Sequence, residues 1–166
     1  MIKPSYNILK RFDDAATLER IIKELKSYRV RIGFLAGAGV HDAESMLPTA
    51  TIAVYNEYGT PTARHPIPAR PFMRPVFRDK MAQRKEIKRL LPGTVFVKDG
   101  SRLHKSPRVN LFFNLYGMAM ASAVQKMIRS NSPPENAEYT KLLKESSKTL
   151  IDTGAMVQAV SYEVVQ

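Results

Sequence analysis

The residue types that most often bind metals or catalyse reactions are scarce in this sequence. It contains no cysteine, which excludes disulfides, thiolate zinc sites, iron–sulfur clusters and cysteine nucleophiles. The histidines are His41, His65 and His104, and only segment 41–44 combines metal-ligating types, without the spacing of known sites. Segment 37–39 lacks the third glycine of a dinucleotide site, and there is no Walker or G-x-S-x-G motif. We therefore expect no catalytic residue, no metal and no cofactor.

The sharpest short motif is Asp152-Thr153-Gly154. It resembles the active-site loop of retroviral-type aspartic proteases, in which two such loops share one proton between two carboxylates. A protease half-site needs several strands after this loop, and only twelve residues follow Gly154. We therefore expect a structural turn in which Asp152 caps the residues that follow and Gly154 adopts backbone angles closed to other residues.

The positive charge is concentrated in the central third of the chain. The whole sequence has 26 Lys and Arg against 15 Asp and Glu, a net charge of +11. Segment 60–110 alone holds 13 basic and 3 acidic residues, and the segments on either side are nearly neutral. Such a block is typical of a surface for an anionic partner: nucleic acid, an acidic protein or a membrane surface. The alternative is a solvated face that keeps the protein soluble.

No sequence-reading DNA or RNA motif accompanies the basic block, so any nucleic-acid contact is expected to involve phosphates. The candidate residues for contact with an anion or an acidic partner are Arg64, Arg70, Arg74, Arg78, Arg84, Lys85, Lys88, Arg89, Lys98, Arg102, Lys105 and Arg108.

Hydrophobic periodicity predicts helices and strands in a single domain that spans residues 1–166. The expected helices cover 13–28, 49–58, 72–91 and 111–130, with a weakly helical stretch at 135–147. The expected strands cover 30–34, 94–97 and 160–164, with a hairpin turn at Asp99-Gly100. Pro92-Gly93 is expected to end the third helix. The order lacks a βαβ rhythm, so we predict an α+β fold in which a mainly antiparallel sheet packs against two long helices.

Two segments do not fit regular elements. Four prolines lie within 60–71 and remove backbone donors, so this segment is predicted to be an extended arm that lies on another surface. Segment 92–110 is predicted to be a basic hairpin or loop insertion. No apolar run approaches the roughly 20 residues that span a bilayer, and the amino terminus does not resemble a secretory signal. We expect a cytosolic protein that has no membrane partner.

Several segments together resemble the neck, tail-completion and minor tail proteins of tailed bacteriophages. That family combines a V-x-V-G strand, N-E-F/Y-G-T at a helix end, an arm I-P-A-R-P-F-x-R, and L-I-D-T-G-x-L/M before the last strand. The matching segments are VRIGF at 30–34, AVYNEYGT at 53–60, IPARPFMRP at 67–75, NSPP at 131–134, SSKTLIDTGAM at 146–156 and SYEV at 161–164.

The resemblance implies a virion subunit without catalytic activity. Copies of the chain, six as suits a tail, would form a ring at the neck or the head-proximal end of the tail, after a stage in the host cytoplasm. Neighbouring connector, tail-terminator or tube rings and the DNA in the lumen would be its partners. The arm would contact the next subunit through Ile67, Pro68, Ala69, Arg70, Pro71, Phe72 and Met73, with Phe72 and Met73 as anchors. The competing hypothesis is a sequence-independent nucleic-acid-binding protein that uses segment 60–110.

Overall fold

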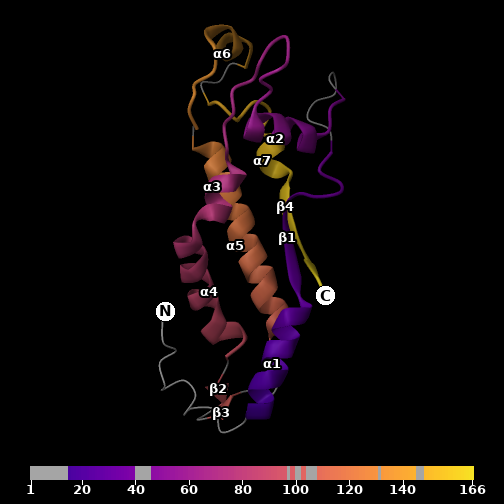
Figure 1. Ribbon diagram of the computed structural model, residues 1–166, viewed down its shortest axis with the longest axis vertical. Coiled ribbons are helices and arrows are strands. Elements are labelled where there is room, and N and C mark those ends of the chain that lie inside the picture. The colour runs from indigo at the N-terminus through magenta and orange to yellow at the C-terminus, as the bar shows by residue number, and fades with distance from the viewer. Residues whose placement is uncertain are drawn as a thin grey trace.

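One long helix organises the molecule. The computed structural model describes residues 15–39, 46–96, 98–99, 102–103, 108–130, 132–144 and 148–166. Helix α5 (Val109–Arg129) runs along an elongated body, with α3 (Met73–Arg78) and α4 (Lys80–Thr94) on one side and strands β1 (Arg29–Phe34) and β4 (Val160–Val165) on the other (Figure 1). Helix α1 (Ala15–Ser27) lies at one end. Helices α2 (Thr49–Tyr58), α6 (Glu138–Lys144) and α7 (Ala155–Gln158) lie at the other.

Strands β1 and β4 form the antiparallel ribbon that the alternating residues predict. Ile32 pairs with Tyr162, and Val30 pairs with Val164. The ribbon packs closely on α5 because Gly117 has no side chain: a Cβ there would lie 2.4 Å from the Tyr162 ring. This sheet has two strands within the described residues. The mixed helix-and-strand class is therefore confirmed, but the sheet is much smaller than predicted.

The helix predicted over 72–91 is interrupted. Asp79 leaves helical geometry with ψ of 81°, and its carboxylate accepts the Ala82 N–H at 2.9 Å, which starts α4 as a new helix. Apolar spacing alone does not reveal this break. Within the described residues, α5 with 21 residues is the one long helix, because the second is divided into segments of 6 and 15 residues.

Helix α4 also ends later than predicted. It continues through Pro92 and Gly93 to Thr94. The Val95 and Phe96 N–H groups then donate to the Leu91 carbonyl at 3.0 and 2.9 Å. The strand predicted from Thr94 is therefore wrong over 94–96, because these backbone groups close the helix instead of pairing with another strand.

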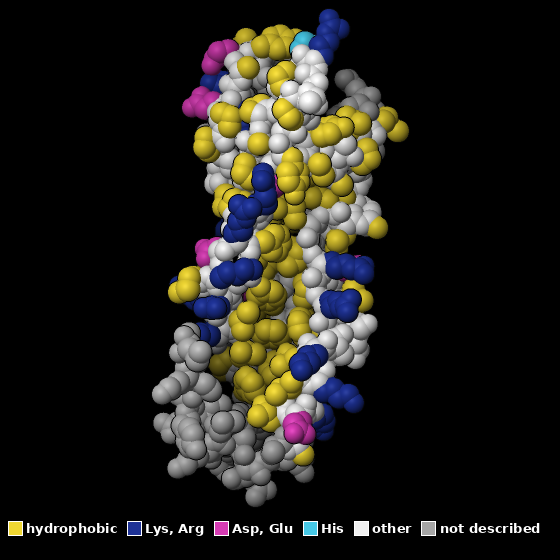
Figure 2. All heavy atoms as spheres, in the orientation of Figure 1, with side chains coloured by type: hydrophobic (Ala, Val, Ile, Leu, Met, Phe, Trp, Pro, Cys, Tyr) yellow, Lys and Arg dark blue, Asp and Glu magenta, His cyan; other side chains and the backbone are white. Residues whose placement is uncertain are grey.

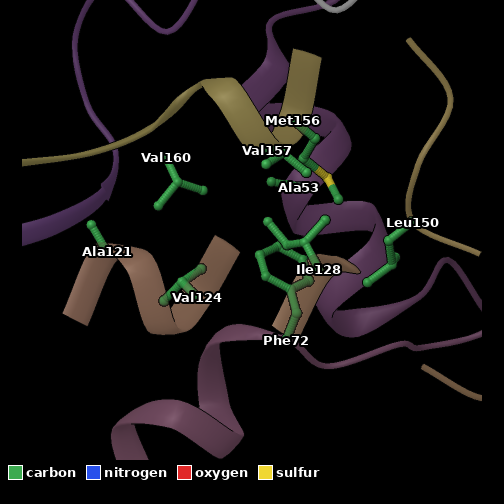
Figure 3. Packing of buried hydrophobic residues seen from close by; sticks show 9 residues of the cluster. All are labelled: Ala53, Phe72, Ala121, Val124, Ile128, Leu150, Met156, Val157 and Val160. Carbon is green, nitrogen blue, oxygen red and sulfur yellow. The ribbon is translucent and has the colours of Figure 1, made fainter. Parts of the chain in front are cut away.

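Apolar side chains are buried in two clusters along α5. The first lies toward α2 and joins Phe72 to α5 and α7, with Phe72 beside Ile128 (Figure 3). Its buried members are Ala53, Phe72, Ala121, Val124, Ile128, Leu150, Met156, Val157 and Val160. The second lies toward α1 and consists of Ile21, Leu90, Val95, Val109 and Phe112. These clusters hold helices and ribbon together by non-directional burial.

The basic hairpin is present as β2 (Lys98–Asp99) paired antiparallel with β3 (Arg102–Leu103). Its turn residue Gly100 lies outside the described residues, as do Asp13, segment 41–44, His104 and Lys105.

Candidate functional site

Three of the segments that carry the resemblance meet at the α2 end of the molecule. Helix α2 ends at Gly59, which has a φ of 76° and donates its N–H to the Tyr55 carbonyl. A Cβ on Gly59 would lie 2.8 Å from the Ile67 oxygen and 2.9 Å from the Ala69 nitrogen. Both the positive φ and the close approach of the returning chain therefore require glycine here.

A buried carboxylate fastens the end of α2 to the start of α3. Glu57 is 4% exposed. Its two oxygens accept the N–H groups of Phe72, Met73 and Arg74 at 2.7, 2.9 and 3.0 Å, and the Arg74 Nε at 2.9 Å. These N–H groups belong to the first turn of α3 and have no partner within the helix. Glu57 thus supplies from another helix the cap that α3 needs.

Arg74 makes two further contacts with the end of α2. Its Nη2 donates to the Glu57 carbonyl oxygen at 2.6 Å. Its guanidinium carbon lies 4.7 Å from the centre of the Tyr58 ring, in cation–π geometry.

The environment of Glu57 keeps it ionised. Burial by itself raises the pKa of Glu57, whereas the N–H groups of Met73, Phe72 and Arg74 and the Arg74 side chain lower it. The resulting pKa lies below the ordinary glutamate value, because several donors stabilise the carboxylate. Near neutral pH this position therefore holds a buried negative charge paired with Arg74.

Arg70 joins a third segment to the same place. It is 5% exposed, and its Nε and Nη2 donate to the carbonyl oxygens of Pro134 and Glu135 at 2.7 and 3.0 Å. Its backbone N–H donates to the Asn56 carbonyl at 2.6 Å. Burial lowers the pKa of Arg70, but a guanidinium stays charged in proteins. We call the set Glu57, Gly59, Arg70, Phe72 and Arg74 the junction.

The junction changes the interpretation of segment 60–73. The extended arm is not confirmed, because Thr60 closes the segment into a loop by donating its N–H to the Ile67 oxygen at 2.9 Å. Phe72 is 0% exposed and fills the core of its own chain, and Arg70 is also buried. Neither side chain is available as the predicted contact with a neighbouring subunit. Ile67, Pro68 and Ala69 are exposed, and their contact with a neighbour stays a prediction.

Three of the predicted anion-binding residues are engaged within the chain. Arg74 pairs with Glu57, Arg89 pairs with Glu86, and Arg70 binds two carbonyls. The exposed members of the set are Arg64, Arg78, Arg84, Lys85, Lys88 and Arg108. The side chains of Lys98, Arg102 and Lys105 lie outside the described residues.

The backbone conformation predicted for Gly154, in the turn at 152–154, is confirmed. Gly154 has a φ of 82°, in the left-handed region. Gly154 itself is the N-cap of α7, and the Thr153 hydroxyl accepts the Ala155 N–H at 3.2 Å. Asp152 is exposed and lies two residues before this N-cap, and its predicted role in capping the turn stays a prediction.

Glu57 was not predicted to be a site residue, although its position in α2 could have predicted that it is buried. Thr49, Ala53 and Glu57 recur every four residues and form the buried face of α2. A carboxylate on that face requires donors from elsewhere in the fold.

The opposite face of α2 exposes apolar side chains. Val54 is 53% exposed, Tyr55 38% and Tyr58 62%. Met46 and Leu47, which precede the helix, are 68% and 38% exposed. We call these five residues the α2 patch. Large apolar side chains that are exposed close together in the chain are typical of interaction sites.

Comparison of the chain with protein-family models, curated proteins and solved structures finds no match. In the part of the chain that the structure describes, no group of three His, Asp or Glu side chains is arranged to hold a metal ion. None of the described helices has the length and apolar character needed to cross a membrane.

Proposed function

We propose that this chain is a structural virion protein of a tailed bacteriophage, a subunit of a ring at the neck or the head-proximal end of the tail. The observation that carries the proposal is the junction. Segments 53–60, 67–75 and 132–134, which carry part of the resemblance, are separated in sequence and contact one another there.

The contacts also explain why these segments need their particular residues. Gly59 allows the close approach of Ile67, Glu57 caps α3, and Arg70 reaches Pro134. A chance likeness between short motifs would not require the motifs to depend on one another. The mutual dependence supports a shared architecture as the source of the resemblance.

The α2 patch is the proposed subunit interface. It lies on the helix that the junction fixes, so its side chains are held in place before assembly, which reduces the ordering cost of association. A contact between this patch and a different surface of the next copy closes into a ring when the rotation between copies closes. The exposed Ile67 lies next to Gly59 at the end of α2 and extends the patch.

The decisive experiment is cryo-electron microscopy of virions from the phage or prophage that encodes the chain. We expect density for this fold in a closed ring at the neck or tail end, with the α2 patch covered by a neighbouring copy. Isolated copies that do not touch one another, or virions without the protein, would overturn the proposal.

A matched pair of variants tests the interface. Tyr55→Asp places a charge in the α2 patch, and Met81→Asp places one on α4, where Met81 is 74% exposed. We expect loss of infectious particles with Tyr55→Asp and normal particle yield with Met81→Asp. The competing nucleic-acid-binding function predicts instead that the purified protein binds DNA, with a log–log salt slope of about −0.9 per neutralised phosphate.

A further inference from the structure

An apolar strip runs along the face that Figure 2 shows. Hydrophobic side chains follow the middle of this face, between α3 and α4 on one side and β1 and α1 on the other. At its α2 end the strip opens into a cavity of about 640 Å³, which Ile32, Phe34, Met73 and Phe77 help to line. Toward the α1 end, half-buried side chains pack against the second cluster, among them Tyr28, which follows α1, Leu91 of α4 and Phe113 of α5. The Tyr28 and Phe113 rings stack with centroids 5.4 Å apart.

Basic side chains border the strip on both sides. Figure 2 shows Lys and Arg over α3 and α4 along one edge and over β1 and α1 along the other. Arg78 lines the cavity, and Arg84 and Lys88, one helical turn apart, continue the row along exposed α4. Asp79 and Glu86 line a different cavity between α4 and α5. Glu57 lines the cavity of the strip, where its charge is paired with Arg74. On the opposite edge, Arg29 is exposed and Arg31 forms a surface pair with Glu163.

We infer that this strip binds an amphipathic helix of a partner protein, with an apolar face against the strip and acidic residues along both flanks. The apolar side chains of such a helix would enter the cavity and contact Phe77 and Phe113. Its carboxylates would face the Arg84 and Lys88 row and the row at β1. A helix that matches the 15 residues of α4 spans about 22 Å.

Other occupants fit this surface less well. A second copy would bring a chain of net charge +11 against the same charge, which opposes association. DNA would use the basic rows for its phosphates but would leave the apolar strip between them without a matching surface. The cavity at the end of the strip shares Val54 and Tyr58 with the α2 patch. Arg84 and Lys88 lie on α4, outside that patch, so variants at these two residues test the strip and not ring assembly.

The test uses the full chain and two synthetic peptides of about 16 residues. Both peptides carry leucines at helical spacing, and they differ only in glutamate or lysine on the flanks. Fluorescence anisotropy should show saturable binding of the glutamate peptide and at least tenfold weaker binding of the lysine peptide. The double variant Arg84→Glu, Lys88→Glu should bind the glutamate peptide at least tenfold more weakly than the wild type.

Lys126→Glu is the matched control, because Lys126 is also exposed but lies on α5 and lines the other cavity, the one that contains Asp79 and Glu86. It should change affinity less than threefold, and circular dichroism should confirm that all variants stay folded. Equal binding of both peptides, or no binding of either, would overturn the inference. It would also be overturned if a short DNA duplex bound more tightly than the glutamate peptide. Self-association that the double variant abolishes would identify a second copy as the occupant instead.

Discussion

The two ends of the molecule are stabilised by different means. At the α1 end the core is apolar, and Thr94, which bonds to the Leu90 carbonyl, is the one buried polar residue in the described part of that end. At the α2 end the buried polar residues are Thr49, Glu57, Arg70, Ser132, Asn136 and Thr149. Burial of apolar area tolerates small shifts, whereas buried hydrogen bonds fix distances and directions. The α2 end is therefore built to hold surface residues in a defined arrangement, and the α1 end to provide cohesion.

The largest expected effect follows from removal of the buried carboxylate. Glu57→Ala leaves three α3 N–H groups and the Arg74 side chain without their acceptor. We expect a loss of about 3–5 kcal/mol in the free energy of unfolding, because each buried N–H group left without an acceptor costs about 1–3 kcal/mol. Urea denaturation measures this loss.

Glu86→Ala is the control for this prediction. It removes the partner of Arg89 on the exposed surface of α4, where an ion pair contributes about 0–1 kcal/mol. Equal losses in the two variants would contradict the distinction between the buried junction and the helical surface.

The junction should also make stability depend on pH in the acid range. Because the pKa of Glu57 is lowered in the folded protein, the native state binds fewer protons there than the unfolded chain does. The stabilisation is complete above the ordinary value of 4.5 and is lost as pH falls below it, through the lowered folded value. The stability difference between wild type and Glu57→Gln should therefore shrink as pH falls through this window. A difference that stays constant down to the acid transition would show that the pKa of Glu57 is the same in the folded and the unfolded chain.

The two ends also differ in how far the sequence predicted them. Apolar periodicity was sufficient to predict α1, α5 and the two strands of the β1–β4 ribbon. Each of these elements buries one face, and its apolar residues recur at the spacing of that face. The two alternating segments predicted both strands of the ribbon, but not their register, in which Ile32 pairs with Tyr162. Local patterns did not predict the junction, because Glu57, Arg70 and Phe72 depend on partners distant in sequence. Proline content suggested an extended arm, but the buried Phe72 and the Arg70 hydrogen bonds keep residues 70–72 on their own chain.

An intermediate effect is expected from a methyl group at Gly59. In Gly59→Ala the new Cβ meets the Ile67 oxygen and the Ala69 nitrogen at under 3 Å, at a φ that disfavours a side chain. We expect a loss of about 1–3 kcal/mol in the free energy of unfolding.

Gly93→Ala is the control, and its effect on stability should have the opposite sign, because Gly93 lies in α4 with open space around it. Alanine in a helix should stabilise by about 0.5–1 kcal/mol. Thermal unfolding of both variants should show shifts in opposite directions, and a neutral Gly59→Ala would mean that the returning chain relaxes freely.

The smallest expected effect concerns the turn before α7, which tests whether polar contacts at the α2 end matter even on the surface. The exposed Thr153 hydroxyl accepts the Ala155 N–H at 3.2 Å. Thr153→Ala should cost about 0.5–1 kcal/mol, as for a lost cap, and Thr153→Ser should restore most of it because the hydroxyl remains. Differential scanning calorimetry should show that the wild type is the most stable, Thr153→Ser is next and Thr153→Ala is the least stable. A Thr153→Ala variant as stable as the wild type would show that the contact contributes nothing.

A peptide-cleavage assay on Asp152→Asn tests whether the same turn is catalytic. Pepstatin-sensitive cleavage by the wild type that this variant loses, with stability unchanged, would establish a catalytic turn in place of a structural one.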